Sequence, residues 1–318
     1  MENMKRTIGA IGIWSMELRE AARPEVREAA AELDQLGFPA LWVPGLDGQG
    51  AVDDVEHLLA AAPGATVALG VLSMWGQDPA ALGDRWAALD AAYGPRAVLG
   101  LGVSNAHSAA NAGQDYGKPT VSMARFLDGL DAAPRPIPAE RRLLGALGPK
   151  MVDLAAARTS GWHPFLVTPE HSARQRARVG DGPLITPHLA VVLDRDPDRA
   201  RAAARAGVGM FIGFPAYRSN LARLGFGEED LVPGGSDRLI DALVAWGDLD
   251  DVADRVQAHL DAGADHITLH VLRPDTDGAG PPREQWRELA ALLPRFTART
   301  AHRPTLASPG ANTRIGDA

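Results

Sequence analysis

The sequence predicts an α/β protein built as a single (β/α)8 barrel of the TIM type. Two observations carry this prediction. Short apolar segments alternate with helix-like segments at intervals of roughly 30 residues, which is typical of repeated βα units. Each apolar segment then opens into glycine or small polar residues, most clearly at 99–105, LGLGVSN. Parallel barrel strands end in this way at the face that carries the active site, where glycine lets backbone amides approach a ligand.

Eight strands are expected, which is the number that closes a parallel barrel of this kind. They lie near residues 8–14, 39–44, 66–73, 97–103, 142–147, 162–167, 185–193 and 266–272. Between them, proline near the start and glycine near the end mark helices at 24–37, 79–94 and 149–161.

The connection between the seventh and eighth strands is longer than a βα unit needs. Residues 208–250 are therefore expected to form an insertion, mainly helical, over the pocket. A helix near 283–293 should complete the ring, so that residues 1–295 form one domain. The remaining residues, 296–318, are rich in small residues, proline and arginine, and we expect a disordered tail.

Composition narrows the classes of partner. The 318 residues carry a net charge of −8, which argues against affinity for nucleic acids or anionic membranes. Cysteine is absent, so thiol nucleophiles, thiolate metal sites and disulfides are excluded. The histidines are too scattered for a metal-ligand motif, and no metal site is expected. Without a signal-like start or a long apolar run, we expect a soluble cytoplasmic protein that acts on a small molecule. The sequence leaves open whether the protein forms a homodimer.

Several separated motifs resemble one enzyme family. They are 11–15 (IGIWS), 37–44 (GFPALWVP), 75–79 (WGQDP), 100–104 (GLGVS), 116–119 (YGKP), 146–151 (ALGPKM), 234–239 (GGSDRL) and 261–266 (DAGADH). In their order and spacing they resemble the luciferase-like monooxygenase superfamily, and within it the oxidoreductases that use the deazaflavin coenzyme F420. The resemblance runs from Ile8 to Leu272 and beyond.

The resemblance implies a bacterial luciferase-like barrel, with an isoalloxazine-like ring across the carboxyl ends of the strands. It implies that the third strand bulges at Gly70-Val71, with a non-prolyl cis peptide behind the ring. The end of the fourth strand would border the pyrimidine side, and Gly148 would lie in a phosphate-binding turn at a helix start. The cofactor-binding residues implied in this way are Gly70, Val71, Ser73, Val103, Ser104, Asn105, Ala146, Leu147, Gly148, Pro149 and Lys150.

The chain also departs from the family at polar positions. Gly45 stands where many relatives carry a carboxylate or histidine after the second strand. Ser73, Gln77 and Asn105 stand where relatives commonly have Asn, Arg and His. Each change removes a charge or a long donor, so cofactor binding, substrate choice or the redox chemistry is expected to differ while the fold is retained.

His163 on the sixth strand is the candidate general acid or base, because histidine changes its charge near neutral pH. Strand position alone leaves open whether it faces the pocket or packs against a neighbouring strand. The residues expected around the substrate are Trp14, Gly45, Trp75, His188 and Tyr217.

These residues favour hydride transfer between F420 and a small organic substrate at the carboxyl face of the barrel. In that case the coenzyme carries the chemistry, and the protein orients the reactants and excludes water. One alternative is an FMN-dependent monooxygenase of the same fold. The other is a barrel that uses no cofactor and either catalyses a cyclisation, isomerisation or elimination, or only binds a ligand, because polar groups are missing at Gly45, Ser73, Gln77 and Asn105.

Overall fold

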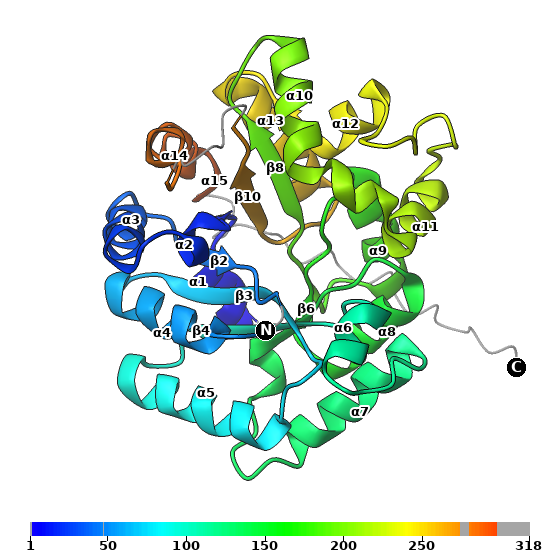
Figure 1. Ribbon diagram of the computed structural model, residues 1–318. Helices are drawn as coiled ribbons and strands as arrows, with labels where there is room; N and C mark the ends of the chain where they lie inside the picture. Colours follow the sequence, from blue (N-terminus) through cyan, green and yellow to red (C-terminus); the bar gives the residue numbers. More distant parts are fainter. Residues whose placement is uncertain (1, 47, 274–279, 298–318) are drawn as a thin grey trace, which may run out of the picture.

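The computed structural model describes residues 2–46, 48–273 and 280–297 (Figure 1). The strands are β1 (Ile11–Trp14), β2 (Ala40–Val43), β3 (Thr66–Ser73), β4 (Ala97–Gly102), β5 (Arg142–Leu144), β6 (Gly161–Trp162), β7 (Leu184–Ile185), β8 (His188–Val192), β9 (Val244–Trp246) and β10 (Ile267–Val271). The helices are α1 (Glu2–Ile8), α2 (Glu17–Glu20), α3 (Arg23–Gln35), α4 (Ala51–Ala61), α5 (Pro79–Tyr93), α6 (Ala106–Asn111), α7 (Pro119–Asp131), α8 (Pro149–Arg158), α9 (Pro169–Val179), α10 (Pro197–Val208), α11 (Pro215–Leu224), α12 (Asp237–Leu243), α13 (Leu249–Asp261), α14 (Arg283–Ala290) and α15 (Leu293–Thr297), with 3-10 turns η1 (Ala139–Arg141) and η2 (Gly209–Gly213).

The strands form one curled sheet with helices on its outside, which confirms the predicted α/β, TIM-barrel-like fold (Figure 1). Within the described residues it has ten strands in the order β7-β6-β5-β4-β3-β2-β1-β10-β8-β9. The paired strands are parallel, for example β1 with β2 and β10. The carboxyl ends of neighbouring strands therefore meet on one face.

The predicted seventh strand is divided into β7 and β8 by Thr186 and Pro187. This segment is hydrogen bonded on both sides. The amide of Thr186 donates to the carbonyl oxygen of Trp162 in β6 over 3.0 Å, and the amide of Thr268 in β10 donates to that of Pro187 over 3.0 Å. The divided strand thus joins the two sides of the ring.

The predicted insertion at 208–250 contains η2, α11, α12 and also β9. β9 was not expected from the sequence. It pairs with the end of β8 through Ala190 and Val244, on the side of β8 away from β10, and so lengthens the sheet. The insertion is mainly helical, as expected, and the sequence missed only this strand, because a three-residue strand is fixed by its neighbour and not by a pattern of its own.

β3 has the irregularity that the resemblance implies. Its register with β4 shifts between Leu69 and Leu72, and the peptide bond between Gly70 and Val71 is cis. Both expectations for this segment are confirmed.

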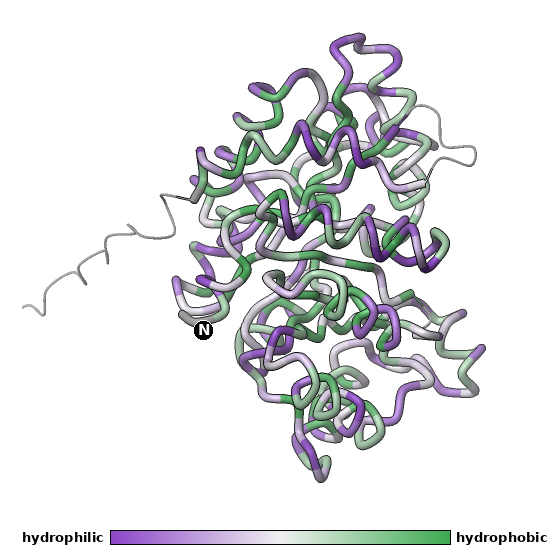
Figure 2. The backbone as a smooth tube through the Cα atoms, turned by 90° about the vertical axis from the view of Figure 1, so that its left-hand side faces the viewer, coloured by the Kyte–Doolittle hydropathy of each residue, from purple (hydrophilic) through white to green (hydrophobic). Residues whose placement is uncertain are grey.

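Apolar segments follow the strands through the interior, and hydrophilic segments lie mainly on the outer helices (Figure 2). Inside the ring, Trp14 and Trp42 pack with small and aliphatic strand residues. Met4 and Ile8 of α1 belong to the same cluster, so this helix covers the amino-terminal end of the barrel. The folded region also continues past the predicted boundary at 295, because Phe296 of α15 is buried. Residues 298–318, most of the predicted tail, lie outside the described residues.

Candidate active site

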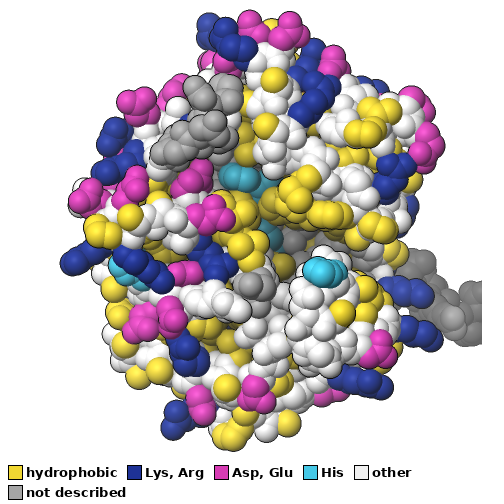
Figure 3. Space-filling model, in the orientation of Figure 1, with side chains coloured by type: hydrophobic (Ala, Val, Ile, Leu, Met, Phe, Trp, Pro, Cys, Tyr) yellow, Lys and Arg dark blue, Asp and Glu magenta, His cyan; other side chains and the backbone are white. Residues whose placement is uncertain are grey.

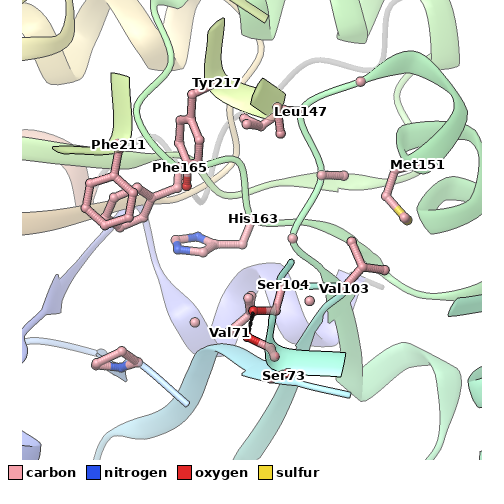
Figure 4. Close-up of a pocket in the computed structure, with 18 of the residues that line it drawn as sticks. Val71, Ser73, Val103, Ser104, Leu147, Met151, His163, Phe165, Phe211 and Tyr217 are labelled. Carbon is pink, nitrogen blue, oxygen red and sulfur yellow. Dashed lines mark hydrogen bonds between the residues drawn. The ribbon is translucent and has the colours of Figure 1, made fainter. Parts of the chain in front are cut away.

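A cavity of about 690 Å³ opens at the carboxyl ends of the strands. Hydrophobic side chains gather around the hollow in the middle of this face, and charged side chains lie mostly toward its edge (Figure 3). Eleven of the sequence-predicted residues line the cavity: Trp14, Gly70, Val71, Ser73, Val103, Ser104, Ala146, Leu147, Gly148, His163 and Tyr217. The structure therefore brings together residues that are far apart in the sequence (Figure 4).

Val71 lies across glycines at the ends of β4 and β5. A Cβ atom at Gly102 would be 2.7 Å from Val71 Cγ2, and one at Gly145 would be 3.2 Å from the same atom. Larger residues at these positions would displace Val71, so the glycines allow a low apolar floor. The Trp14 Nε1–H group donates to the carbonyl oxygen of Gly70 over 2.9 Å and holds the bulge from the side of β1.

Four aromatic side chains, Trp14, Phe165, Phe211 and Tyr217, form a wall beside this floor. Ring centroids are 5.5 Å apart between Trp14 and Phe165, 5.0 Å between Phe165 and Phe211, and 5.5 Å between Phe211 and Tyr217. These separations are typical of favourable aromatic contacts. The wall thus joins β1, the loop after β6 and the segment η2–α11.

His163 lies at the base of the cavity, with Nε2 packed toward Gly70, where a Cβ atom would be 3.2 Å away. Its Nδ1 lies 2.6 Å from the carbonyl oxygen of Thr186, so Nδ1 must carry the proton and donate it. Its Nε2 is buried and has no hydrogen-bond partner within the described chain. Burial lowers the pKa of His163 to about 4, so the imidazole is neutral at physiological pH. His163 Nε2 is therefore a hydrogen-bond acceptor and carries no proton to donate.

Pro164, the residue after His163, explains why the carbonyl oxygen of Thr186 is free to accept from the imidazole. In the parallel register of β6 and β7, the following ladder bond would run from the amide of residue 164 to the oxygen of Thr186. Pro164 has no amide hydrogen. The ladder resumes one step later, where the amide of His188 donates to the oxygen of Pro164 over 3.0 Å.

The other end of the cavity is basic. Gly148 precedes α8, whose first amides have no helical partner and favour an anion. A Cβ atom at Gly148 would lie 3.8 Å from Nη2 of Arg223, which also lines the cavity. Arg223 is the one charged residue among those lining residues that the structure describes.

Six predicted residues lie outside the lining, and for three of them a single local contact gives the reason. At Gly45 a Cβ atom would be 2.3 Å from Cα of Leu72, so the bulge of β3 fills the space that a catalytic side chain would need. The side chain of Asn105 caps α6 by accepting the amide of Ser108 over 3.0 Å. Trp75 donates from Nε1 to the oxygen of Val103 over 2.6 Å at the edge of the site.

His188 supports the wall from behind. Its ring stacks on Phe165 with centroids 3.7 Å apart, and its Nε2 lies 2.9 Å from Nδ1 of His270. Burial lowers the pKa of His188 well below its ordinary value, and the neighbouring His270 adds to this effect. The remaining two predicted residues, Pro149 and Lys150, occupy the first turn of α8, beside the lining residue Gly148.

Sequence reasoning missed about half of the lining. The missed residues are Met16, Pro44, Leu46, Gly145, Met151, Ser108, Phe165, Phe211, Ala216 and Arg223. Those from Phe211 onward belong to the segment expected over the pocket, and the available signal was the grouping of Phe211, Phe214 and Tyr217 within seven residues of sequence. Which residues of this segment face the cavity depends on how η2 and α11 pack against the rest of the barrel, and no local sequence pattern specifies that packing.

Positive backbone φ angles gather near this face. In the described part of the chain, the residues other than glycine with positive φ are Leu46 (46°), Ser104 (47°) and Leu166 (52°). They follow β2, β4 and β6, and the first two line the cavity. Such conformations are uncommon for side-chain-bearing residues and occur often at functional sites.

Among the described residues, no group of three or more His, Asp or Glu side chains has the arrangement of a metal site. Nor does any helix in those parts of the chain have the length and apolar character needed to cross a membrane.

The sequence profile of the luciferase-like monooxygenase family matches residues 10–266. The chain belongs to this family. Among curated proteins, no sequence matches the chain.

Solved structures share the fold at low sequence identity. The coenzyme F420-dependent tetrahydromethanopterin reductase from Methanopyrus kandleri has a TM-score of 0.70 and 17% identity, covering 91% of this chain and 99% of its own. An F420-dependent secondary alcohol dehydrogenase in complex with an F420-acetone adduct has a TM-score of 0.69 and 14% identity, with the same coverage. The oxygenating constituent of 3,6-diketocamphane monooxygenase from Pseudomonas putida, in complex with FMN, has a TM-score of 0.63 and 13% identity, covering 92% and 98%. At such identities the comparison establishes the fold.

Proposed function

We propose that this chain is an oxidoreductase that binds coenzyme F420 and exchanges a hydride between the coenzyme and a small organic substrate. The observation that carries the proposal is the floor of the cavity, where Val71 lies across Gly102 and Gly145. A low apolar surface, with no side chain rising from Gly102 or Gly145, fits the face of a planar tricyclic ring. Membership in the luciferase-like monooxygenase family supports redox chemistry.

The basic end of the cavity fits the charged part of the same ligand. Amides at the start of α8, beside Gly148, and the guanidinium of Arg223 would bind a phosphate group. Lys150 in the first turn of α8 adds positive charge, and no ion pair engages it within the described chain. F420 carries several negative charges along its phosphate and glutamate tail, which favours F420 over FMN at this end.

The residues of the chain would orient the reactants and keep water out. The deazaflavin supplies the hydride chemistry when it is bound. The aromatic wall formed by Trp14, Phe165, Phe211 and Tyr217 excludes water from the space above the floor. His163 would act as a neutral hydrogen-bond acceptor, because its Nε2 carries no proton. This geometry favours a positioning or accepting role for His163 over the general-acid role that its sequence position also allowed.

Titration of the purified protein with F420, followed by the fluorescence of the coenzyme, tests the proposal. FMN serves as the control ligand. We expect saturable binding of F420 and weaker binding of FMN. Binding of FMN alone would assign the chain to the flavin-dependent monooxygenases of this fold. If neither ligand binds, the redox proposal fails, and the cofactor-free alternative becomes the better account.

A further inference from the structure

Asn220 holds the guanidinium of Arg223 at the basic end of the cavity. Its Oδ1 accepts a hydrogen bond from Nη2 of Arg223 over 3.3 Å. The same Nη2 lies 3.8 Å from where a Cβ atom of Gly148 would be. Because Nη2 carries two N–H groups, one can bond Asn220 while the other is left for an anion. No carboxylate is among the lining residues that the structure describes, so none of them competes for this charge.

Arg223 needs such a support because it is an exposed residue. A long, exposed arginine side chain samples many rotamers, and an anion that binds it must order them. A partner that holds the guanidinium before the ligand arrives removes part of this entropy loss. Asn220 is itself buried and lies one helical turn before Arg223 on α11, so it is a fixed anchor.

Helix α9 in turn holds α11 at two points (Figure 1). Arg174 donates from Nη1 to the backbone oxygen of Arg223 over 2.5 Å. The side chain of His171 is hydrogen bonded to that of Asn220. Neither Nε2 of His171 nor Nδ2 of Asn220 has a partner within the described chain, so this bond joins Nδ1 of His171 to Oδ1 of Asn220. Burial, with the charge of Arg223, lowers the pKa of His171 to about 4, so the imidazole is neutral at physiological pH.

These side chains belong to a buried polar cluster where α9 meets α11 and α13. Its members are His171, Ser172, Asn220 and His259. Among the residues that the structure describes, Oγ of Ser172 and both ring nitrogens of His259 also lack partners. Buried polar atoms without partners are uncommon because they destabilise the fold, and apolar residues would pack here at lower cost. Packing alone therefore does not account for Asn220 and His171.

We propose that Asn220 and His171 are positioning residues that set the affinity of the basic end of the cavity for an anion. His171 orients the amide of Asn220, and Asn220 orients the guanidinium of Arg223 toward Gly148. Neither residue lines the cavity, so both act through Arg223. This inference rests on the proposed function for the identity of the anion, which is the phosphate of the coenzyme, and it adds the residues that prepare its binding.

Inorganic pyrophosphate is the probe, and calorimetry measures its affinity for the purified protein without coenzyme. We expect saturable binding by the wild type. Arg223→Gln removes the charge and should weaken binding by about tenfold or more. Asn220→Leu keeps the size of the side chain and removes Oδ1, so it should weaken binding by about threefold to tenfold. Ser172→Ala is the matched control from the same cluster, and it should leave the affinity unchanged because Ser172 Oγ has no hydrogen bond to lose within the described chain.

A double variant separates positioning from damage to the helix. If Asn220 acts through Arg223, Asn220→Leu should have no effect on pyrophosphate binding in the Arg223→Gln background. The amides at the start of α8 remain there and keep some affinity to measure. Distortion of α11 would instead lower the affinity further.

A pair of variants at position 171 gives a second, independent readout. His171→Asn keeps a donor near the place of Nδ1 and should retain most of the affinity for pyrophosphate. His171→Leu removes the donor and should weaken binding as Asn220→Leu does.

The proposal is overturned if the wild type does not bind pyrophosphate, if Asn220→Leu binds it as tightly as the wild type, or if the effects of Asn220→Leu and Arg223→Gln add. Should Asn220→Leu not fold, equal affinities for His171→Asn and His171→Leu overturn it. The outcome is separate from the coenzyme titration. Loss of F420 binding with the expected order of pyrophosphate affinities rejects the redox proposal and retains this one, and F420 binding with unchanged pyrophosphate affinities in the variants does the reverse.

Discussion

The imidazole of His163 is stacked on the indole of Trp42, with ring centroids 4.9 Å apart and 21° between the ring planes. Trp42 also contacts His266, whose centroid lies 5.6 Å away and whose Nε2 accepts the indole N–H over 3.0 Å. The Nδ1–H of His266 donates to the oxygen of Gly9 over 2.9 Å, beside the end of α1. A continuous column of rings therefore connects the amino-terminal end of the barrel with the floor of the cavity.

The column makes stability depend on pH. Burial lowers the pKa of His266 to about 4, whereas an unfolded chain titrates near 6.5. The unfolded state therefore binds more protons between these values, and stability present above pH 6.5 is lost as the pH falls toward 4. His266→Gln should remove about 2 kcal/mol of the loss between pH 7.5 and 5.0. Urea unfolding at both pH values measures this, and replacement of the exposed His107 by Gln is the control. Equal losses in wild type and His266→Gln would contradict the prediction.

Gly45→Ala should destabilise the fold. The added methyl group would lie 2.3 Å from Cα of Leu72, so the bulge of β3 must move. Overpacking of this kind costs about 1 to 3 kcal/mol, and we expect Tm to fall by several degrees. Gly182→Ala is the matched control, because nothing lies within 4 Å of the position where its methyl group would be. An unchanged Tm for Gly45→Ala would show that the bulge yields easily.

Gly148→Asp should weaken binding of F420 by about tenfold or more, because its carboxylate repels the phosphate and competes for Arg223. The φ angle of Gly148 is −88°, which any residue adopts. Gly148→Ala therefore tests size alone and should bind F420 nearly as well as the wild type. Equal affinities for the Asp and Ala variants would remove the start of α8 from the site.

Asn105→Ala should lower the free energy of unfolding by about 1 kcal/mol, because the start of α6 loses its cap. Asn105→Asp keeps an acceptor for the amide of Ser108 and should retain most of that stability. Thermal unfolding of the two variants distinguishes them. If Asn105 instead contacts the coenzyme, Asn105→Ala would lower F420 affinity without a change in Tm.

The sequence was sufficient for those parts of the molecule that depend on local pattern. Proline near the start and glycine near the end predicted the helices now seen as α3, α5 and α8. Alternation of apolar and helical segments predicted the ring, and the resemblance correctly located the bulge at Gly70 and Val71. These features are encoded within a few residues of where they occur.

The parts that could not be predicted depend on contacts between distant segments. Arg223 and Gly148 are 75 positions apart, and only the docking of α11 brings them together. The exclusion of a side chain at Gly45 depends on the path of β3. Asn105 shows the opposite situation. An asparagine directly before a helix is a usual N-cap signal, and its side chain does accept the amide of Ser108, but the resemblance led to a ligand role instead.

The tautomer of His163 depends on a residue outside the lining of the cavity. Pro164→Ala would restore an amide that competes with His163 for the oxygen of Thr186. With Nδ1 released, the proton can move to Nε2, and this buried nitrogen beside Gly70 would change from acceptor to donor. The protonation pattern of a residue at the base of the cavity is thus governed by an interruption in a β-ladder, at a position that does not itself line the cavity.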